Sequence, residues 1–295
     1  MKYMYRVLGL NVRVPFPCPG LVLAPAKECH DVLLTEGAVP RELEGAVAAE
    51  GNGQAAPGRF LLRGGQQAGR FLVEDGSRIT FERSPGAQLS VIVTHLLSSV
   101  IVAVLNQRGM LVLHANVALT PRGAIAITGE SGAGKSTTLA ALVAHGCDML
   151  SDDITVLQFN SSQRIVALPG VRKMNLCEDA AVRLGHDIDF LERYPLRQTK
   201  VMVPLTADAV MEPVPLEAIF HLHRHAGDRV TRTQCIGAEK FSALQEFVYG
   251  PLFLSDHLGL FDLISALTKQ VDIFRIGRPE SRWCLDEIME AISVG

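Results

Sequence analysis

Short apolar and polar segments alternate through the first 85 residues and are separated by turn residues, a pattern that predicts β-strands. The candidate strands cover residues 5–14, 31–35, 60–62, 70–73 and 78–82. An Asp75-Gly76 pair between the last two is typical of a tight hairpin turn. Residues 44–59 are rich in Ala, Gly and Glu and predict a mobile surface loop. We therefore expect residues 1–85 to form a small antiparallel β-rich domain with a substrate-docking or structural role.

The longest apolar run covers residues 89–105 and predicts a helix. It is slightly short for a bilayer span, which needs roughly 20 residues, and it is interrupted by polar side chains. These are Ser90, Thr94, His95, Ser98 and Ser99. A buried helix explains this composition best, and a membrane span and a partner-binding helix are the alternatives.

From residue 86 the pattern changes to longer apolar segments with both strand and helix periods. Strands are expected at residues 110–114, 116–119, 124–128 and 147–150, and an Ala/Leu-rich helix at 136–145. Gly146 stands where a left-handed helix cap favours glycine. Strand, helix and strand in this order predict a βαβ unit with a right-handed parallel crossover. Residues 86–295 are thus expected to form an α/β domain.

Composition narrows the class of protein without adding chemistry. The chain of 295 residues is long enough for about two domains, and 48% hydrophobic residues exclude a disordered chain. Lys and Arg number 28 against 31 Asp and Glu, so no basic excess supports nucleic-acid binding. The six cysteines are scattered and form no C-x-x-C pair, which favours a cytoplasmic protein. With the charge balance and the buried-helix interpretation of residues 89–105, we expect neither nucleic-acid nor membrane partners.

A glycine-rich segment, residues 129–136, follows the expected strand 124–128 and opens the expected helix. Its sequence, GESGAGKS, fits the pattern G-x-x-x-x-G-K-[ST] in full. In such a loop, backbone N–H groups surround phosphate oxygens at a helix N-terminus, Lys135 reaches the β- and γ-phosphates, and the Ser136 hydroxyl ligates Mg²⁺. The expected ATP-binding residues are Gly129, Ser131, Gly132, Ala133, Gly134, Lys135, Ser136 and Thr137. The alternative is a chance glycine turn before a helix.

Two adjacent carboxylates, Asp152 and Asp153, follow the expected strand 147–150. Ten helical residues rise about 15 Å, and a short return strand brings the chain back to the sheet edge that carries the glycine-rich loop. Ligands gather at that edge of open α/β sheets. One carboxylate there can hold Mg²⁺, and the other can accept a proton from an attacking hydroxyl. A polar strand end or helix cap is the alternative.

The run of residues 113–157 resembles the catalytic core of the HPr kinase/phosphorylase family. His114-Ala115, the loop 129–136, His145-Gly146 and Ser151-Asp152-Asp153 stand at the places of that family's His-Gly, G-[DE]-S-G-x-G-K-S, R-G-H and A-D-D segments. The resemblance implies an α/β P-loop kinase domain, similar to HPr kinase and to the nucleotide-binding fold of phosphoenolpyruvate carboxykinase, preceded by the small β-rich N-terminal domain. It also implies that ATP and Mg²⁺ are used to phosphorylate a protein serine.

The same resemblance, which covers residues 95–180 well, implies roles for individual side chains. Asp152 is the expected general base, Asp153 belongs to the metal and phosphate network, and Lys135 binds phosphate. Asp152, His114 and Lys135 are therefore the expected catalytic residues, and Asp153 joins Ser136 as an expected metal ligand. His114 is expected close to the reacting centre, where a histidine that merely satisfies a strand end is the alternative.

The chain also departs from the HPr kinases. Their E-x-R-G-x-G segment is replaced by ALPGVRK at residues 167–173, which has an arginine but no glutamate. Residues 169–185, followed by Arg193, Arg197 and Lys200, look more like the HPr-kinase-related group that includes lasso-peptide-tailoring kinases. That likeness implies transfer to the C-terminal serine of a precursor peptide. We therefore expect a peptide or small-protein substrate with an acceptor serine in preference to HPr itself, and a homo-oligomer is a further expectation.

Basic and histidine side chains supply the remaining candidates. Arg172 and Arg197 are expected to clamp phosphates, because guanidinium groups match phosphate oxygens, with solvated surface charge as the alternative. His221, His223 and His225 alternate, which places all three on one strand face. A zinc site would need further ligands at suitable spacing, so a plain strand face is favoured. Two functions besides a kinase stay open, namely a nucleotide-sensing regulator without phosphotransfer and a simple NTPase.

Overall fold

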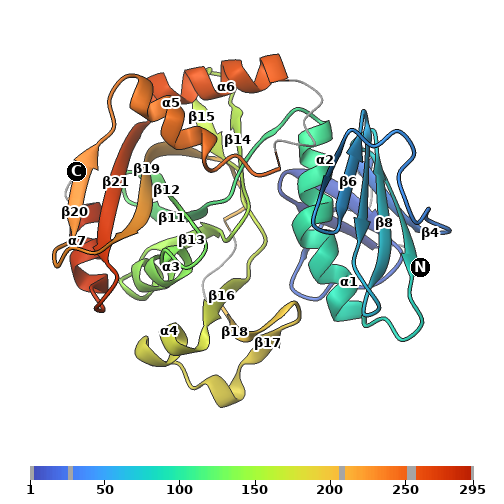
Figure 1. Cartoon of the computed structure of the whole chain (residues 1–295), viewed down its shortest axis with the longest axis horizontal. Helices are drawn as coiled ribbons and strands as arrows, with labels where there is room; N and C mark the ends of the chain where they lie inside the picture. The colour runs from blue at the N-terminus through green and yellow to red at the C-terminus, as the bar shows by residue number, and fades with distance from the viewer. Residues whose placement is uncertain (1–2, 26–28, 206–209, 251–256, 294–295) are drawn as a thin grey trace. The chain divides into compact units, whose positions relative to one another are not determined.

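The computed structural model describes residues 3–25, 29–205, 210–250 and 257–293, and within them a mixed α/β fold with several sheets. The chain forms two compact units (Figure 1). Unit 1 comprises Met1–Val112 and Tyr249–Leu260, and unit 2 comprises Leu113–Val248 and Phe261–Gly295. The division falls after residue 112, whereas the sequence places it near residue 85.

Unit 1 is built on a nine-stranded sheet with the order β3-β1-β2-β4-β9-β8-β7-β6-β5. The strands are β1 (Tyr3–Val7), β2 (Leu10–Val14), β3 (Val22–Leu23), β4 (Val32–Glu36), β5 (Ala48–Glu50), β6 (Gly53–Ala56), β7 (Arg59–Arg63), β8 (Gly69–Glu74) and β9 (Arg78–Arg83). The hairpin expected between β8 and β9 is confirmed, and Asp75 and Gly76 there have φ of 51° and 59°.

Three expectations for this sheet are wrong. The single strand 5–14 is a hairpin, because Leu8 and Gly9 adopt φ of 49° and 81° and turn β1 back onto β2. The expected loop 44–59 contains the paired strands β5 and β6. The module is also not purely antiparallel, since β4 runs parallel to both β2 and β9. The parallel pairings of β4 join segments that are far apart in the sequence, so they leave no local signal in the alternation of side chains.

The apolar run after the sheet forms a continuous helical segment of α1 (Leu89–His95), a π-helical stretch η1 (Leu96–Val100) and α2 (Ile101–Gln107). By length and composition its 19 residues could cross a membrane, but 61% of the apolar window is buried in the protein, as in a core helix. Gln107 accepts a hydrogen bond of 2.7 Å from the backbone of Gly76, in the β8–β9 turn. This packing explains why the helix belongs to unit 1 instead of opening the second domain.

Unit 2 is built on a second sheet in which β14, β15, β19, β12, β11 and β13 follow one another, with β21 and β20 on a branch from β19. The strands are β11 (Asn116–Thr120), β12 (Gly123–Gly129), β13 (Asp148–Ser151), β14 (Thr155–Phe159), β15 (Ile165–Ala167), β19 (Val214–His225), β20 (Thr231–Gln234) and β21 (Asp272–Pro279), while β10 (Leu111–Leu113) crosses the boundary between the units. A small sheet has the order β16-β18-β17, from β16 (Met174–Cys177), β17 (Glu192–Tyr194) and β18 (Arg197–Val203).

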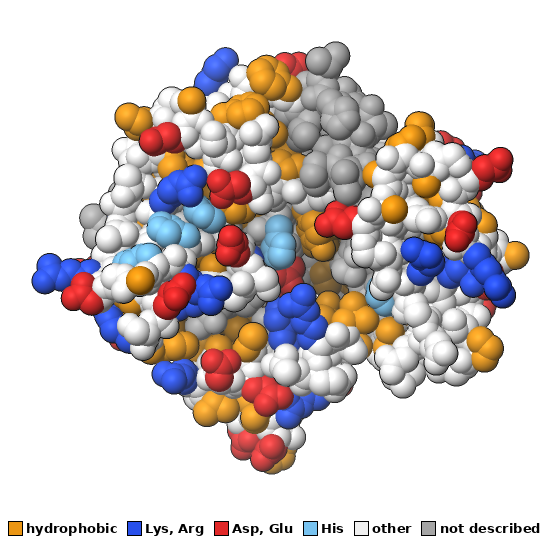
Figure 2. Space-filling model, viewed as in Figure 1, with side chains coloured by type: hydrophobic (Ala, Val, Ile, Leu, Met, Phe, Trp, Pro, Cys, Tyr) orange, Lys and Arg blue, Asp and Glu red, His pale blue; other side chains and the backbone are white. Residues whose placement is uncertain are grey.

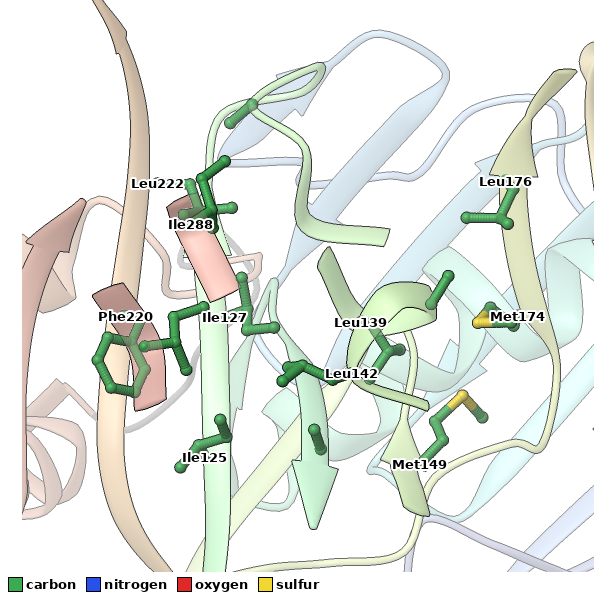
Figure 3. Close-up of a cluster of buried hydrophobic side chains, with 14 of the residues drawn as sticks. Ile125, Ile127, Leu139, Leu142, Met149, Met174, Leu176, Phe220, Leu222 and Ile288 are labelled. Carbon is green, nitrogen blue, oxygen red and sulfur yellow. The ribbon is translucent and has the colours of Figure 1, made fainter. Parts of the chain in front are cut away.

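The described helices of unit 2 are α3 (Lys135–Ala144), α4 (Glu178–Arg183), the 3₁₀ turn η2 (Ile188–Phe190), α5 (Ala238–Gln245), α6 (His257–Gln270), whose first turn lies in unit 1, and α7 (Leu285–Ser293). Helix α3 packs on one face of the main sheet, against β11, β12 and β13. Leu139 and Leu142 of α3 pack with Ile127 of β12, Phe220 of β19 and Ile288 of α7 in one buried cluster (Figure 3). These contacts hold α3 against β12, so the loop that joins the two elements is fixed at both ends.

The order of strands around α3 differs in one respect from the expected βαβ unit. β12 and β13 run in the same direction, but β11 lies between them and pairs antiparallel with both. The two-residue turn Pro121-Arg122 returns the chain from β11 straight into β12, so β11 takes the neighbouring position in the sheet. As a result, the first residue of β11, Asn116, lies between the carboxyl ends of β12 and β13.

Candidate active site

The glycine-rich segment 129–136, which the sequence predicts to bind phosphate and which we call the phosphate loop, follows β12 and opens α3, as the sequence predicts. Gly129 has φ of 141°, and a Cβ atom there would lie 2.3 Å from the carbonyl oxygen of Leu222. Gly134 has φ of 108° and caps the helix. Only glycine fits both positions at low cost, because other side chains are strained or obstructed there. Ser131, Gly132, Ala133 and Thr137 lie in the same turn and first helical turn.

Lys135 is 94% buried and folds back over the loop: its Nζ donates to the carbonyl oxygens of Gly129 at 2.8 Å and Glu130 at 3.3 Å. Burial lowers the pKa of Lys135, and Lys200 adds to this effect, while the nearby carboxylates Asp153 and Asp152 oppose it. A partly desolvated ammonium is a strong attractor for an anion that brings negative charge into the loop.

The carboxyl group of Asp152 is enclosed by amide donors. Oδ1 accepts from Nδ2 of Asn116 at 2.7 Å, and Oδ2 accepts from the backbone N–H of Asn175 at 2.9 Å and from its Nδ2 at 3.3 Å. Burial and the neighbouring Asp153 nevertheless raise the pKa of Asp152 to about 7. A carboxylate has about four lone-pair sites, so this one keeps one acceptor position beyond the three in use.

Asp153 has a different environment from its neighbour. Its φ of 64° is unusual for a residue with a side chain, and such backbone strain is concentrated at functional sites. Oδ1 lies 3.7 Å from Nε2 of His114, and 36% of the side chain is exposed. Burial acts to raise the pKa of Asp153, but the hydrogen bond from His114 and the charges of Lys200 and Lys135 lower it below its ordinary value. Asp153 is therefore ionised at neutral pH, where Asp152, with a pKa of about 7, is ionised in part.

Asn116 joins the phosphate loop to the acidic pair. It is fully buried, and its Nδ2 lies 2.7 Å from Asp152 Oδ1 and 3.4 Å from Ser136 Oγ. Its Oδ1 accepts from the backbone N–H of Asp153 at 3.3 Å. The inserted strand β11 thus supplies one side chain that contacts three of the predicted site residues.

The predicted catalytic side chains His114, Lys135 and Asp152 come together with the predicted metal-site residues Ser136 and Asp153. Asn116 and Asn175 were not predicted, although an asparagine that opens an otherwise apolar strand is a signal that could have drawn attention to Asn116. A fully buried amide needs partners, and those partners are commonly polar groups of a site.

Lys200 is the basic residue of the small sheet whose charge acts on the acidic pair. It pairs with Cys177 across β16 and β18, on the same face as Asn175, which contacts Asp152. Its charge contributes to the pKa shifts of Lys135, Asp152 and Asp153. Arg197 lies three positions earlier on β18, and among the described residues no hydrogen bond or ion pair joins it to the phosphate loop or to the acidic pair. Arg172, half-buried just before β16, stays a prediction, as does Arg197.

The oxygen donors at this edge suit magnesium. Within the described ranges, no group of three or more His, Cys, Asp or Glu side chains could hold a metal ion by itself. Mg²⁺ does not need such a cage, because it is usually held by one or two carboxylates together with phosphates and water. The Ser136 hydroxyl and Asp153 are the side chains that would hold it, beside the amide of Asn116.

His221, His223 and His225 of β19 lie on the opposite face of the strand from Phe220 and Leu222, which pack in the cluster under α3. The rings of His221 and His223 are 6.0 Å apart, and those of His223 and His225 are 6.2 Å apart. Figure 2 shows histidine side chains gathered on one visible face of unit 2, beside acidic and basic ones. Burial, with Arg275 and His223, lowers the pKa of His221 to about 4. That all three rings line one strand face is seen in the stacking of His221 on His223 and in the tilted contact of His223 with His225, and the choice between a plain strand face and a zinc site stays a prediction.

Neither a family model nor a curated protein matches this chain. Among solved structures, it is similar to the Hpr(Ser) kinase/phosphatase from Coxiella burnetii, at 14% identity and a TM-score of 0.31. The similarity covers 62% of this chain and 87% of that chain. What the site can do chemically follows from its own side chains.

Proposed function

We propose that this protein is an ATP- and Mg²⁺-dependent kinase that transfers the γ-phosphate to a serine hydroxyl of a peptide or small protein. The observation that carries the proposal is the contact set of Asn116. Through one side chain it places the Ser136 hydroxyl of a phosphate loop beside the carboxyl of Asp152. A nucleotide-binding loop alone needs no such carboxyl, whereas phosphoryl transfer to an alcohol needs a group that takes the proton.

In the proposed reaction the loop amides and Lys135 hold the triphosphate in place, and catalysis comes from positioning and charge stabilisation. The serine oxygen forms a bond to the γ-phosphorus, and the bond from that phosphorus to the β–γ bridging oxygen breaks. ADP leaves with that electron pair, and the hydroxyl proton goes to the remaining acceptor position of Asp152. Mg²⁺, when bound, neutralises charge on the phosphate oxygens.

The remaining charged groups support this division of roles. Asp153 is ionised and borders both Lys135 and His114, which suits the metal and phosphate network. His114 stays in place through its backbone N–H, which donates to Phe247 at 2.8 Å. Lys200 adds positive charge on the side of the small sheet, where Arg172 and Arg197 are further candidates for phosphate or substrate contacts.

For the acceptor, we propose the C-terminal serine of a precursor peptide of the lasso type, with an HPr-type protein serine as the alternative. The support is the likeness of residues 169–185 to that kinase group and the absence of an E-x-R-G-x-G segment after Asp153. A nucleotide-binding regulator without phosphotransfer is the second candidate function. It would use the same loop but would leave the enclosed carboxyl of Asp152 without a role.

Transfer of label from γ-labelled ATP tests the proposal. The acceptors are a peptide that ends in serine, the same peptide with an internal serine, and a serine-free peptide. We expect label on a serine, and Asp152→Asn should keep ATP binding while transfer falls by about 10²–10⁴. Asp148→Asn, an exposed change on β13, is the matched control.

The possible failures differ from one another. Label released only as inorganic phosphate would identify a simple NTPase. Tight ATP binding with neither transfer nor hydrolysis would favour the regulator. Transfer at the native rate by Asp152→Asn would remove Asp152 as the base.

A further inference from the structure

Arg278, close to the C-terminal end of the chain, binds backbone carbonyl groups of the phosphate loop. Nε of Arg278 donates to the carbonyl oxygen of Ala133 at 2.7 Å, and Nη2 donates to that of Gly132 at 3.0 Å. Nη1 lies 3.4 Å from the carbonyl oxygen of Pro279 in its own strand. The two loop contacts span 145 and 146 residues of sequence, so no local pattern could reveal them.

The sheet explains why Arg278 reaches the loop. β21 runs parallel to β19, which runs parallel to β12, so the carboxyl ends of all three strands meet at one edge. Ile276 packs in the buried cluster under α3, and alternation places Arg278, two residues further on, on the same face. Its guanidinium therefore emerges at the edge where β12 turns into the phosphate loop.

Together, two cations hold four of the carbonyl groups of the loop. Lys135 holds the carbonyls of Gly129 and Glu130, and Arg278 holds those of Gly132 and Ala133. In a trans peptide the N–H points opposite to the C=O. With the Ala133 carbonyl turned toward Arg278, the N–H of Gly134 points to the opposite side of the loop. Carbonyl oxygens on the side where phosphate binds would repel it, whereas N–H groups attract it.

We propose that Arg278 is a positioning residue that forms the phosphate loop for polyphosphate before any nucleotide binds. The inference rests on the proposed function, because it assumes that the loop receives the phosphates of ATP. It assigns Arg278 no contact with the substrate. Its effect passes through the backbone of residues 132–134, and it should act on any ligand that carries a chain of phosphates.

The test is titration calorimetry of the full chain with ATP and, separately, with inorganic triphosphate. Arg278→Met keeps the length of the side chain and removes its donors, and we expect the Kd for both ligands to rise about tenfold or more. Arg278→Lys keeps the charge with a single donor group and should lose less. Guanidinium ion added at millimolar concentration should restore part of the affinity of Arg278→Ala, a rescue that a purely structural role would not show.

Arg282→Met is the matched control, because Arg282 is bound to Glu287 and to the Asp228 carbonyl, away from the loop. Melting curves show which variants are folded, and Arg278→Lys carries the test if the methionine variant is not. Native affinity in a folded Arg278 variant would overturn this inference and leave the proposed function intact. If the native chain binds neither ATP nor triphosphate, both the inference and the proposed function fail.

Discussion

The side-chain amide of Asn116 donates a 2.7 Å hydrogen bond to Oδ1 of Asp152, and the same nitrogen lies 3.4 Å from the hydroxyl of Ser136. One buried amide therefore sets the relative position of a phosphate loop and a carboxyl group that come from different strands. This is possible because β11 is inserted between β12 and β13.

Asn116→Ala should leave the fold of the phosphate loop intact and lower phosphoryl transfer by about 10–100-fold. The physical reason is that Asp152 loses its shortest hydrogen bond and with it a fixed orientation toward the loop. ATP affinity should change less than threefold, because the loop carbonyls are held by Lys135 and Arg278. Initial rates and calorimetry measure the two effects, and Asn52→Ala, an exposed turn change, is the control. Equal losses of affinity and rate would contradict a role confined to Asp152.

Lys135→Met should weaken ATP binding by about tenfold or more and abolish most of the transfer. The ammonium is buried against the loop, where it donates to the carbonyl oxygens of Gly129 and Glu130, and the charges of Asp153 and Asp152 favour its protonated form. Removing it therefore leaves the bound phosphates without their nearest cation. Lys269→Met, an exposed change on α6, provides the comparison. Native ATP affinity in Lys135→Met would show that the loop does not bind phosphate.

Asp153→Asn should raise the Mg²⁺ concentration needed for half-maximal ATP binding by about tenfold. Asp153, whose carboxyl pKa is lowered and whose backbone N–H donates to Asn116, carries the charged oxygen donor that the metal would lose. Titration calorimetry with ATP at a series of Mg²⁺ concentrations measures this concentration from binding alone, so the result does not depend on catalytic activity. Chelation by EDTA should abolish transfer by the native chain, and excess Mg²⁺ should restore it. A magnesium dependence identical to that of the native chain would instead assign Asp153 to a role with His114 alone.

Stability should fall as the pH is lowered from about 6.5 to about 4, in part through His221. Burial and Arg275 lower its pKa to about 4 from the ordinary value of 6.5, so the unfolded chain binds the proton more strongly than the folded chain. The contribution is fully present above pH 6.5 and is on the order of 2 kcal/mol after allowance for solvent screening. His221→Phe should flatten the curve of melting temperature against pH in this window. An unchanged slope would mean that other groups carry the acid sensitivity.

Much of the local structure could be predicted from contiguous residues. The position of the phosphate loop could be predicted because its glycines, Lys135 and Ser136 lie within eight consecutive residues that form a recognisable pattern. The β8–β9 hairpin is similar, because Asp75 and Gly76 meet the backbone requirement of the turn without distant help. Asp152 and Asp153 could be placed at the loop's edge by the length of the helix and the return strand.

Tertiary structure alone decided how these pieces combine into a site. Strand order is set by long-range pairing, so alternation could not show that β11 separates β12 from β13 or that β4 runs parallel to its neighbours. Asn116, Asn175 and Arg278 reach the site across 36, 23 and 145 residues. A side chain's partners at such separations depend on which faces and edges the folded sheet brings together, and the order of residues along the chain does not encode them locally.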